Sequence, residues 1–199
     1  MNARKLWAPA SLLLALSIAA CNASETQKAP EAAPAPAAEP SHKAITTAEL
    51  EPYTCGTIQR MHTLGGVFLA SQPAQDDFAQ AQMGGVKTVI NMRKPAEMAF
   101  DEGATVEGLG MAYFNPGWNG PEELTDEVFQ SYRDMLNTAE RPILLHCGSA
   151  NRVGAVWLPW RVLDEGVSVD AALAEAKEVG LKTPEYEAKA LDYIRRMQK

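Results

Sequence analysis

The sequence predicts an α/β fold in three layers, with a mainly parallel central sheet of about four to five strands flanked by helices. Two observations carry this prediction. Short apolar runs of the kind that form buried strands alternate with longer segments of helical periodicity, which is typical of parallel sheets with crossover helices. A series of helical segments then continues to the end of the chain.

The expected strands are short runs of apolar and β-branched residues. Gly65 and Gly66 separate the first two runs, which favours a hairpin or a pair of edge strands. The last run is too short and too apolar for an exposed strand, so we expect it to be buried and to end at His146. In order, the runs are residues 57–62, 67–70, 86–92, 111–114 and 143–145.

The expected helices are marked by apolar faces of helical period and by signals at their ends. Thr125 and Ser168 are possible N-caps, and Gly180 is a stop signal. The helices cover residues 78–83, 97–107, 122–138 and 167–179, with two more that begin at Arg152 and Pro184.

The first residues indicate export. Arg4 and Lys5 precede an apolar run at residues 12–20, which is typical of a secretory signal peptide and too short for a stable membrane span. Cys21 follows Ile-Ala-Ala, and this resembles the bacterial lipobox, in which the cysteine is lipidated after cleavage. Ordinary secretion with an incidental cysteine is the alternative. Because Asn22 is not an acidic retention signal, the resemblance implies a periplasmic protein that is anchored to the outer membrane.

We therefore expect three segments. Residues 1–20 are a lipoprotein signal peptide, and residues 21–44 are the lipidated Cys21 with a disordered tether rich in alanine and proline. Residues 45–199 form the α/β domain. The lipid anchor is then the only expected contact with a membrane.

Charge and cysteine content restrict the partners. The net charge is −7, and the signal peptide carries two of the positive charges, so nucleic acid is not an expected partner, whereas a local cationic pocket can still take a small phosphate. Besides Cys21 the chain has Cys55 and Cys147. These two either pair in an oxidising periplasm, which would silence Cys147 as a nucleophile, or Cys55 is a small buried residue.

Residues 142–154 are the stretch around which the predicted site is organised. The buried strand stops at Cys147, and a helix begins at Arg152. Backbone N–H groups at such a junction, together with the helix dipole, can bind an oxyanion, and an arginine can add two parallel hydrogen bonds. The same field favours the thiolate of Cys147. We expect Gly148, Ser149, Ala150, Asn151 and Arg152 to bind phosphate while Cys147 attacks it.

This segment resembles the His-Cys-x5-Arg signature of cysteine-dependent phosphatases. It departs from the signature in having four residues between Cys147 and Arg152, and in having Ala150 where a glycine is expected. A wider resemblance, at residues 68–73, 85–93 and 146–155, is to the bacterial beta-lactamase-hydrolase-like phosphatase family, a branch of the dual-specificity type. It covers roughly residues 56–182. It implies a cysteine-phosphatase-like domain that hydrolyses phosphomonoesters through a phosphocysteine, with no metal or other cofactor.

Three further residues are possible supports of the site. His146 orients the loop or is a satisfied core histidine. Arg93, at the end of its strand, lies at the pocket rim or pairs on the surface with Glu97. Asn115 stands where related phosphatases have the aspartic acid that protonates the leaving oxygen, and an amide cannot do so.

The loop after Asn115 contains Trp118, which we expect to be exposed, either beside the substrate or over the sheet edge. Three acids follow, and each is either the missing proton donor or an ordinary acid at a helix start. They are Glu122, Glu123 and Asp126.

Two alternatives to a phosphatase remain. The four-residue interval is familiar from rhodanese-like sulfurtransferases, in which Cys147 would carry a persulfide. Asn115 and Ala150 favour a catalytically impaired protein that binds an oxyanion without turning it over. The sequence leaves open whether the phosphorylated substrate is a protein or a small molecule, and it leaves the oligomeric state open.

Overall fold

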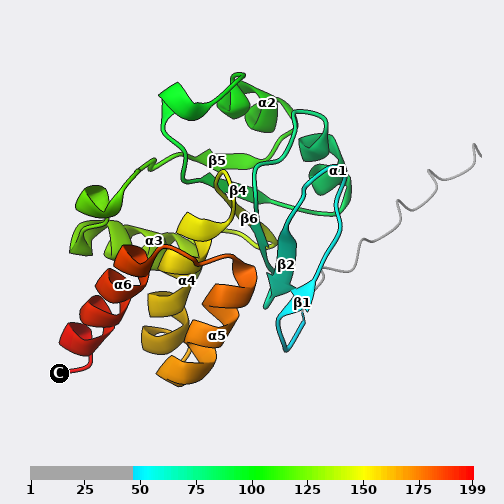
Figure 1. Cartoon of the computed structure of the whole chain (residues 1–199). Coiled ribbons are helices and arrows are strands. Elements are labelled where there is room, and N and C mark those ends of the chain that lie inside the picture. The colour runs from blue at the N-terminus through cyan, green and yellow to red at the C-terminus, as the bar shows by residue number, and fades with distance from the viewer. Residues whose placement is uncertain (1–46) are drawn as a thin grey trace, which may run out of the picture. The chain divides into compact units, whose positions relative to one another are not determined.

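The computed structural model describes residues 47–199, so the expectations for the signal peptide, Cys21 and the tether lie outside the described residues. Residues 47–199 form a six-stranded sheet with helices on both faces (Figure 1). The three-layer α/β class predicted from the sequence is confirmed. No helix within these residues is long and apolar enough to cross a membrane.

The sheet has the strand order β1-β2-β3-β6-β4-β5. The four strands β3, β6, β4 and β5 are mutually parallel, whereas β1 and β2 add an antiparallel edge. The expected hairpin is formed by β2 and β3. The sixth strand, β1, has only two residues, both exposed, and therefore left no apolar pattern to find. The strands are β1 (Glu51–Pro52), β2 (Met61–Leu64), β3 (Val67–Ala70), β4 (Thr88–Asn91), β5 (Ala112–Phe114) and β6 (Ile143–His146).

Six helices and two short 3₁₀ turns complete the domain. Two helix starts differ from the prediction by more than two residues. The turn η1 is separate from α2, which begins only after the Asp101 N-cap, and α3 begins after the Thr125 cap because Pro121 starts the turn η2. The bounds are α1 (Asp77–Met83), η1 (Pro95–Glu97), α2 (Glu102–Gly108), η2 (Pro121–Glu123), α3 (Asp126–Thr138), α4 (Asn151–Leu163), α5 (Val169–Val179) and α6 (Pro184–Met197).

Alternation along the strands divides the core between the two faces of the sheet. Leu145 packs in the cluster that includes residues of α3, α4, α5 and α6, whereas Leu144 packs in the cluster that includes residues of α1 and α2. Successive side chains of a strand point to opposite faces. His146 and Cys147, which follow, are therefore directed into different layers, and Cys147 does belong to the first cluster.

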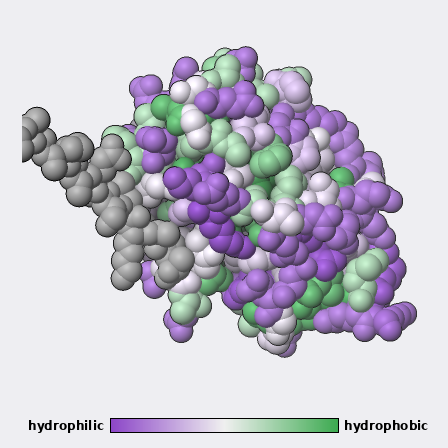
Figure 2. Space-filling view, turned by 180° about the vertical axis from the view of Figure 1, so that it is seen from behind, coloured by the Kyte–Doolittle hydropathy of each residue, from purple (hydrophilic) through white to green (hydrophobic). Residues whose placement is uncertain are grey.

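The outer surface is mainly hydrophilic on the face seen in Figure 2, with small apolar areas between polar side chains. In residues 47–199, the large hydrophobic side chains that remain exposed are Met83, Phe114 and Met197. Apolar burial is thus concentrated in the two internal layers, which hold the sheet rigidly and fix the end of β6.

Candidate active site

The loop between β6 and α4 is short and sharply turned. Ala150 adopts φ 66° and ψ 2°, a left-handed conformation that is unusual for a residue with a side chain. This turn lets α4 start at Asn151, directly beyond the strand. Gln72 holds the other side of the loop, because its backbone N–H donates to Gly148 O at 3.4 Å.

Several backbone N–H groups of this loop have no acceptor within the described part of the chain. They belong to Gly148, Ser149, Asn151 and Arg152, and no side chain caps the start of α4. Such groups need a partner unless water supplies it. Unpaired donors at the N-terminus of a 13-residue helix make this loop suitable for an anion.

The side chain of Asn151 does not take part in such an anion site. Its Oδ1 accepts from the backbone N–H groups of Lys182 and Thr183, at 2.8 and 3.2 Å, and its Nδ2 donates to Thr183 Oγ1 at 2.7 Å. Asn151 thus ties the loop to the segment between α5 and α6. Only its backbone N–H remains available for an anion.

Cys147 and Arg152 lie together at the base of the loop. Cys147 is only 1% exposed, and Arg152 is 8% exposed. Burial by itself lowers the pKa of Arg152, but its hydrogen bonds to Glu97 and Cys147, together with the electrostatic effect of these two side chains, raise that pKa above its usual value. The loop meets solvent at Gly148 and Ser149, which are exposed.

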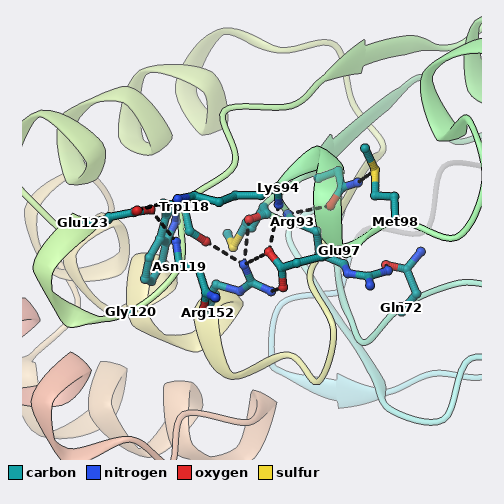
Figure 3. Close-up of polar contacts among 12 residues, drawn as sticks. Gln72, Arg93, Lys94, Glu97, Met98, Trp118, Asn119, Gly120, Glu123 and Arg152 are labelled. Carbon is teal, nitrogen blue, oxygen red and sulfur yellow. Dashed lines mark hydrogen bonds and ion pairs between the residues drawn. The ribbon is translucent and has the colours of Figure 1, made fainter.

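Arg152 is held by one carboxylate and two backbone carbonyls (Figure 3). Its Nη1 and Nη2 donate to the two carboxylate oxygens of Glu97, at 2.9 and 2.8 Å. Nη1 also donates to Met92 O at 3.0 Å and to Trp118 O at 2.6 Å. The hydrogen bond from Arg152 lowers the pKa of Glu97, so this carboxylate stays charged.

One edge of the Arg152 guanidinium makes no bond to a protein oxygen. Nε–H and the second hydrogen of Nη2 have no oxygen acceptor among residues 47–199, while the Cys147 thiol lies within hydrogen-bonding reach of the guanidinium. These two donors form a planar fork that matches two oxygens of a phosphate. Glu97 therefore fixes the guanidinium and leaves its binding edge free.

His146, the residue before Cys147, makes a buried hydrogen bond to Glu102 on the other face of the sheet. Its Nε2 lies 2.8 Å from Glu102 Oε1, and both side chains are at most 1% exposed. Burial raises the pKa of Glu102, but the hydrogen bond and charge of His146 outweigh it, so that the pKa is lowered. The other ring nitrogen, Nδ1, is buried without a partner within the described residues.

Gln72 and Arg93 extend this pair outward. Gln72 Nε2 donates to Glu102 Oε2 at 2.9 Å. Arg93 Nη1 donates to Gln72 Oε1 at 2.7 Å, and Figure 3 shows these two side chains next to each other. The surface pairing of Arg93 with Glu97 considered from the sequence is wrong, because Glu97 pairs with Arg152.

Asn115 fastens the loop that follows β5. Its Nδ2 donates to two backbone carbonyls, those of Asn91 at 2.8 Å and Arg93 at 2.7 Å. Trp118 follows in this loop, and the prediction that it is exposed is wrong, since it is 2% exposed and packs in the core. The indole ring packs against Tyr186 of α6, with the ring centroids 5.2 Å apart, while Arg152 holds the Trp118 carbonyl.

Two of the three candidate proton donors are held in ion pairs. Glu123 accepts from Lys94 Nζ and from Asn119 N, and its pKa is lowered chiefly by Lys94. Asp126 pairs with Arg196 of α6, which lowers its pKa too. Glu122 is exposed. Neither Glu123 nor Asp126 carries a proton near neutral pH.

The other chemistry considered from the sequence concerns metals and disulfides. Cys55 is half-buried and is free, as is Cys147. Within residues 47–199 no group of three or more His, Cys, Asp or Glu side chains is placed to hold a metal ion.

Sequence reasoning missed Glu97 and Glu102 as parts of the site. Glu97 pairs with Arg152, 55 positions later in the chain, and Glu102 pairs with His146, 44 positions later. The only signal was that both acids lie shortly after the carboxyl end of a parallel strand, where ligand sites gather.

Solved structures with the same architecture are phosphatases. TpbA from P. aeruginosa, in a cysteine-to-serine variant in complex with phosphotyrosine, has a TM-score of 0.57 and 20% identity, and the match covers 70% of this chain and 90% of that chain. Tk-PTP in the active form has a TM-score of 0.55 and 18% identity, and the match covers 66% of this chain and 93% of that chain. Kinase associated phosphatase, with its catalytic site cysteine replaced by serine, has a TM-score of 0.60 and 12% identity. This match covers 66% of this chain and 87% of that chain.

The fold of this chain is that of cysteine phosphatases. No family model matches the sequence, and no curated protein matches it either. The name of the beta-lactamase-hydrolase-like family therefore remains an inference from the motifs at residues 68–73, 85–93 and 146–155.

Proposed function

We propose that this protein is a cysteine-dependent phosphatase that hydrolyses phosphomonoesters through a phosphocysteine intermediate. The observation that carries the proposal is the loop from Cys147 to Arg152. It combines a thiol at its base, unpaired backbone donors around it, and a guanidinium beside that thiol whose Nε–Nη2 edge has no oxygen acceptor in residues 47–199. A phosphate has three equatorial oxygens that such donors can hold in the transition state.

The proposed reaction has two steps. The Cys147 thiolate attacks phosphorus, an S–P bond forms, and the bond from phosphorus to the leaving oxygen breaks. Water then attacks phosphorus, the S–P bond breaks, and inorganic phosphate and the thiolate are released. Arg152 and the loop amides stabilise the charge on the oxygens in both steps.

The leaving oxygen has no evident proton donor in this site. Asn115 donates both of its amide hydrogens to carbonyls, and Glu123 is held as a carboxylate by Lys94. General acid catalysis is worth about 10²–10⁴-fold in rate. We therefore expect substrates with good leaving groups, such as aryl phosphates, to be turned over much faster than alkyl phosphates.

A turnover assay tests the proposal. Hydrolysis of p-nitrophenyl phosphate is measured under reducing conditions for wild type, Cys147→Ser and Arg152→Ala, with Cys55→Ser as the matched control for loss of a thiol. We expect vanadate-sensitive activity that the Cys147 change abolishes, the Arg152 change cuts strongly and the Cys55 change leaves in place. Equal activity of wild type and Cys147→Ser would refute the mechanism.

Two observations favour an oxyanion-binding protein without turnover as the second candidate. Asn115 is fully used as a structural donor, and Ala150 holds a strained conformation in the loop. If wild type shows no turnover while Cys147→Ser binds vanadate or phosphate, this candidate replaces the first. The four-residue interval favours sulfur transfer, which thiosulfate:cyanide activity would reveal.

We also propose that the protein is a periplasmic lipoprotein carried by the outer membrane. The support is the pattern of residues 12–22 alone, with Cys21 as the lipidated residue. Cys21→Ser should release the protein from the membrane fraction and abolish labelling by a fatty acid. Unchanged fractionation of the variant would show that the anchor lies elsewhere.

A further inference from the structure

Arg93 lies beside the first residue of the loop. Asn91 of β4 and Ala70 of β3 both pair with His146 of β6, one on either side. Two residues further along these three segments are Arg93, Gln72 and Gly148. Arg93 and Gln72 thus flank Gly148, and the bond between their side chains joins the two neighbours of the loop.

The charge of Arg93 is not neutralised by a paired acid. Its guanidinium donates to the neutral Gln72 Oε1, and no carboxylate oxygen within residues 47–199 lies inside 4.0 Å of it. Glu97 is close enough to feel the charge, but its two oxygens are taken by Arg152. Arg93 is half-buried and keeps further N–H donors free.

Arg93 is also held in a defined position. Its backbone N–H donates to Asn91 Oδ1 at 2.8 Å, and its carbonyl accepts from Asn115. Gln72 is fixed as well, because both hydrogens of its amide are used, one toward Glu102 Oε2 and one toward Pro73 O at 3.0 Å. Its Oε1 must therefore face Arg93. The buried Glu102 carboxylate therefore orients the Gln72 amide, and this amide in turn orients the Arg93 guanidinium.

A polar cleft of about 320 Å³ opens on the same side of the loop. Its walls include Gln72 and Gly148 together with Thr57 and Gln59, and Arg93 adjoins it through its bond to Gln72. A substrate whose phosphoryl group sits in the loop therefore has room for a neighbouring polar group beside Gly148. An aromatic wall is absent from this cleft, which argues for recognition by charge and hydrogen bonds.

We propose that Arg93 binds a second anionic group of the substrate, a carboxylate or phosphate carried next to the phosphoryl group that is cleaved. This inference rests on the proposed phosphatase function and names its substrate class. A preoriented guanidinium with free donors and no acid to compete for them is the arrangement that favours a bound anion. Gln72 and Glu102 act as positioning residues for it.

The test compares matched substrates. Carboxyphenyl phosphates are set against the carbamoylphenyl phosphates with the same substitution, and phosphotyrosine peptides with a neighbouring Asp are set against the same peptides with Asn. In wild type we expect kcat/KM to favour the anionic member by about tenfold or more, as for one charge-assisted hydrogen bond. In Arg93→Gln this ratio should fall to about one, and in Lys94→Gln, which removes the adjacent exposed cation, it should persist.

Two outcomes would overturn the inference: a wild-type ratio near one for every pair, or a ratio in Arg93→Gln that equals that of wild type. A preference confined to the aryl pairs or to the peptides would identify the source of the second anion. If wild type hydrolyses none of them, the phosphatase proposal fails first. Calorimetry then measures the affinity of Cys147→Ser for the same pairs of compounds. Equal affinity for the two members of each pair would reject the proposal that Arg93 binds a second anion.

Discussion

Arg152 and Glu97 are joined by two hydrogen bonds, of 2.8 and 2.9 Å, across 55 positions of the chain. Glu97 accepts from Nη1 and Nη2, at the end of the guanidinium, and leaves the Nε edge without an oxygen acceptor in residues 47–199. The same guanidinium donates to Met92 O and Trp118 O, so that the segments after β4 and β5 are both fixed to it. One arginine thus joins three segments and still has two donors to offer.

Replacing Glu97 by Gln should lower kcat/KM for aryl phosphates by about 10- to 100-fold, because a guanidinium that shifts by about an ångström no longer meets the phosphate oxygens. Steady-state kinetics measures the loss, and circular dichroism shows that the fold is kept. Glu123→Gln, at an exposed acid on the neighbouring loop, is the control. If both variants lose activity equally, the Glu97 contact is not specific.

Asn115→Asp should not create a proton donor. The new carboxylate would face the carbonyl oxygens of Asn91 and Arg93, which now accept from the amide at 2.8 and 2.7 Å. We expect a loss of about 1–3 kcal/mol in the free energy of unfolding, since hydrogen bonds are replaced by repulsion. Urea denaturation measures it. A gain in kcat for alkyl phosphates would mean that the loop can turn this residue toward the substrate.

Stability should fall in acid through Glu102. Its pKa in the folded protein is lowered, because the bond and charge of His146 outweigh the opposite effect of burial. A lowered folded pKa gives stability above the unfolded value, about 4.3, that is lost as pH falls through the folded pKa. Urea denaturation between about pH 3 and pH 7 should show this loss. In Glu102→Gln the slope in the acid range should be shallower, and an unchanged slope would assign the effect to other carboxylates.

Ala150→Gly should stabilise the protein. Ala150 is held at φ 66°, where a side chain costs about 1–2 kcal/mol relative to glycine. Part of this gain is offset by the greater freedom of glycine in the unfolded chain, so we expect an increase of about 1 kcal/mol or less in the free energy of unfolding. Thermal denaturation measures it. A decrease would show that the Ala150 methyl group, which packs near Gly180, contributes more than the strain costs.

Gly154→Ala should destabilise the protein. A Cβ at Gly154 would lie 2.6 Å from Ala176 O of α5 and 2.9 Å from Leu181. Because the obstacle is backbone, α4 and α5 must move apart, at a cost of about 1–3 kcal/mol. Gly108→Ala is the control, since nothing lies within 4 Å of the corresponding Cβ. Equal stability of the two variants would contradict the close contact.

Local patterns in the sequence determined the elements and the central loop. Strand β6 and the start of α4 were predictable because a short apolar run, small residues and a helical period follow one another within residues 142–154. Ser168 and Thr125 were recognised as N-caps because a cap acts on residues three positions away. The unusual position of Ala150 was also visible, as a residue where glycine is expected.

Tertiary structure alone decided what surrounds that loop. Glu97 and Glu102 reach Arg152 and His146 only because parallel strands bring their carboxyl ends to one edge of the sheet. Trp118 is buried against Tyr186 of α6, and a tryptophan in a turn-rich loop carries no sign of a partner so far along the chain. Contacts between residues far apart in the chain depend on strand order and register, and neither is encoded in the pattern of any one segment.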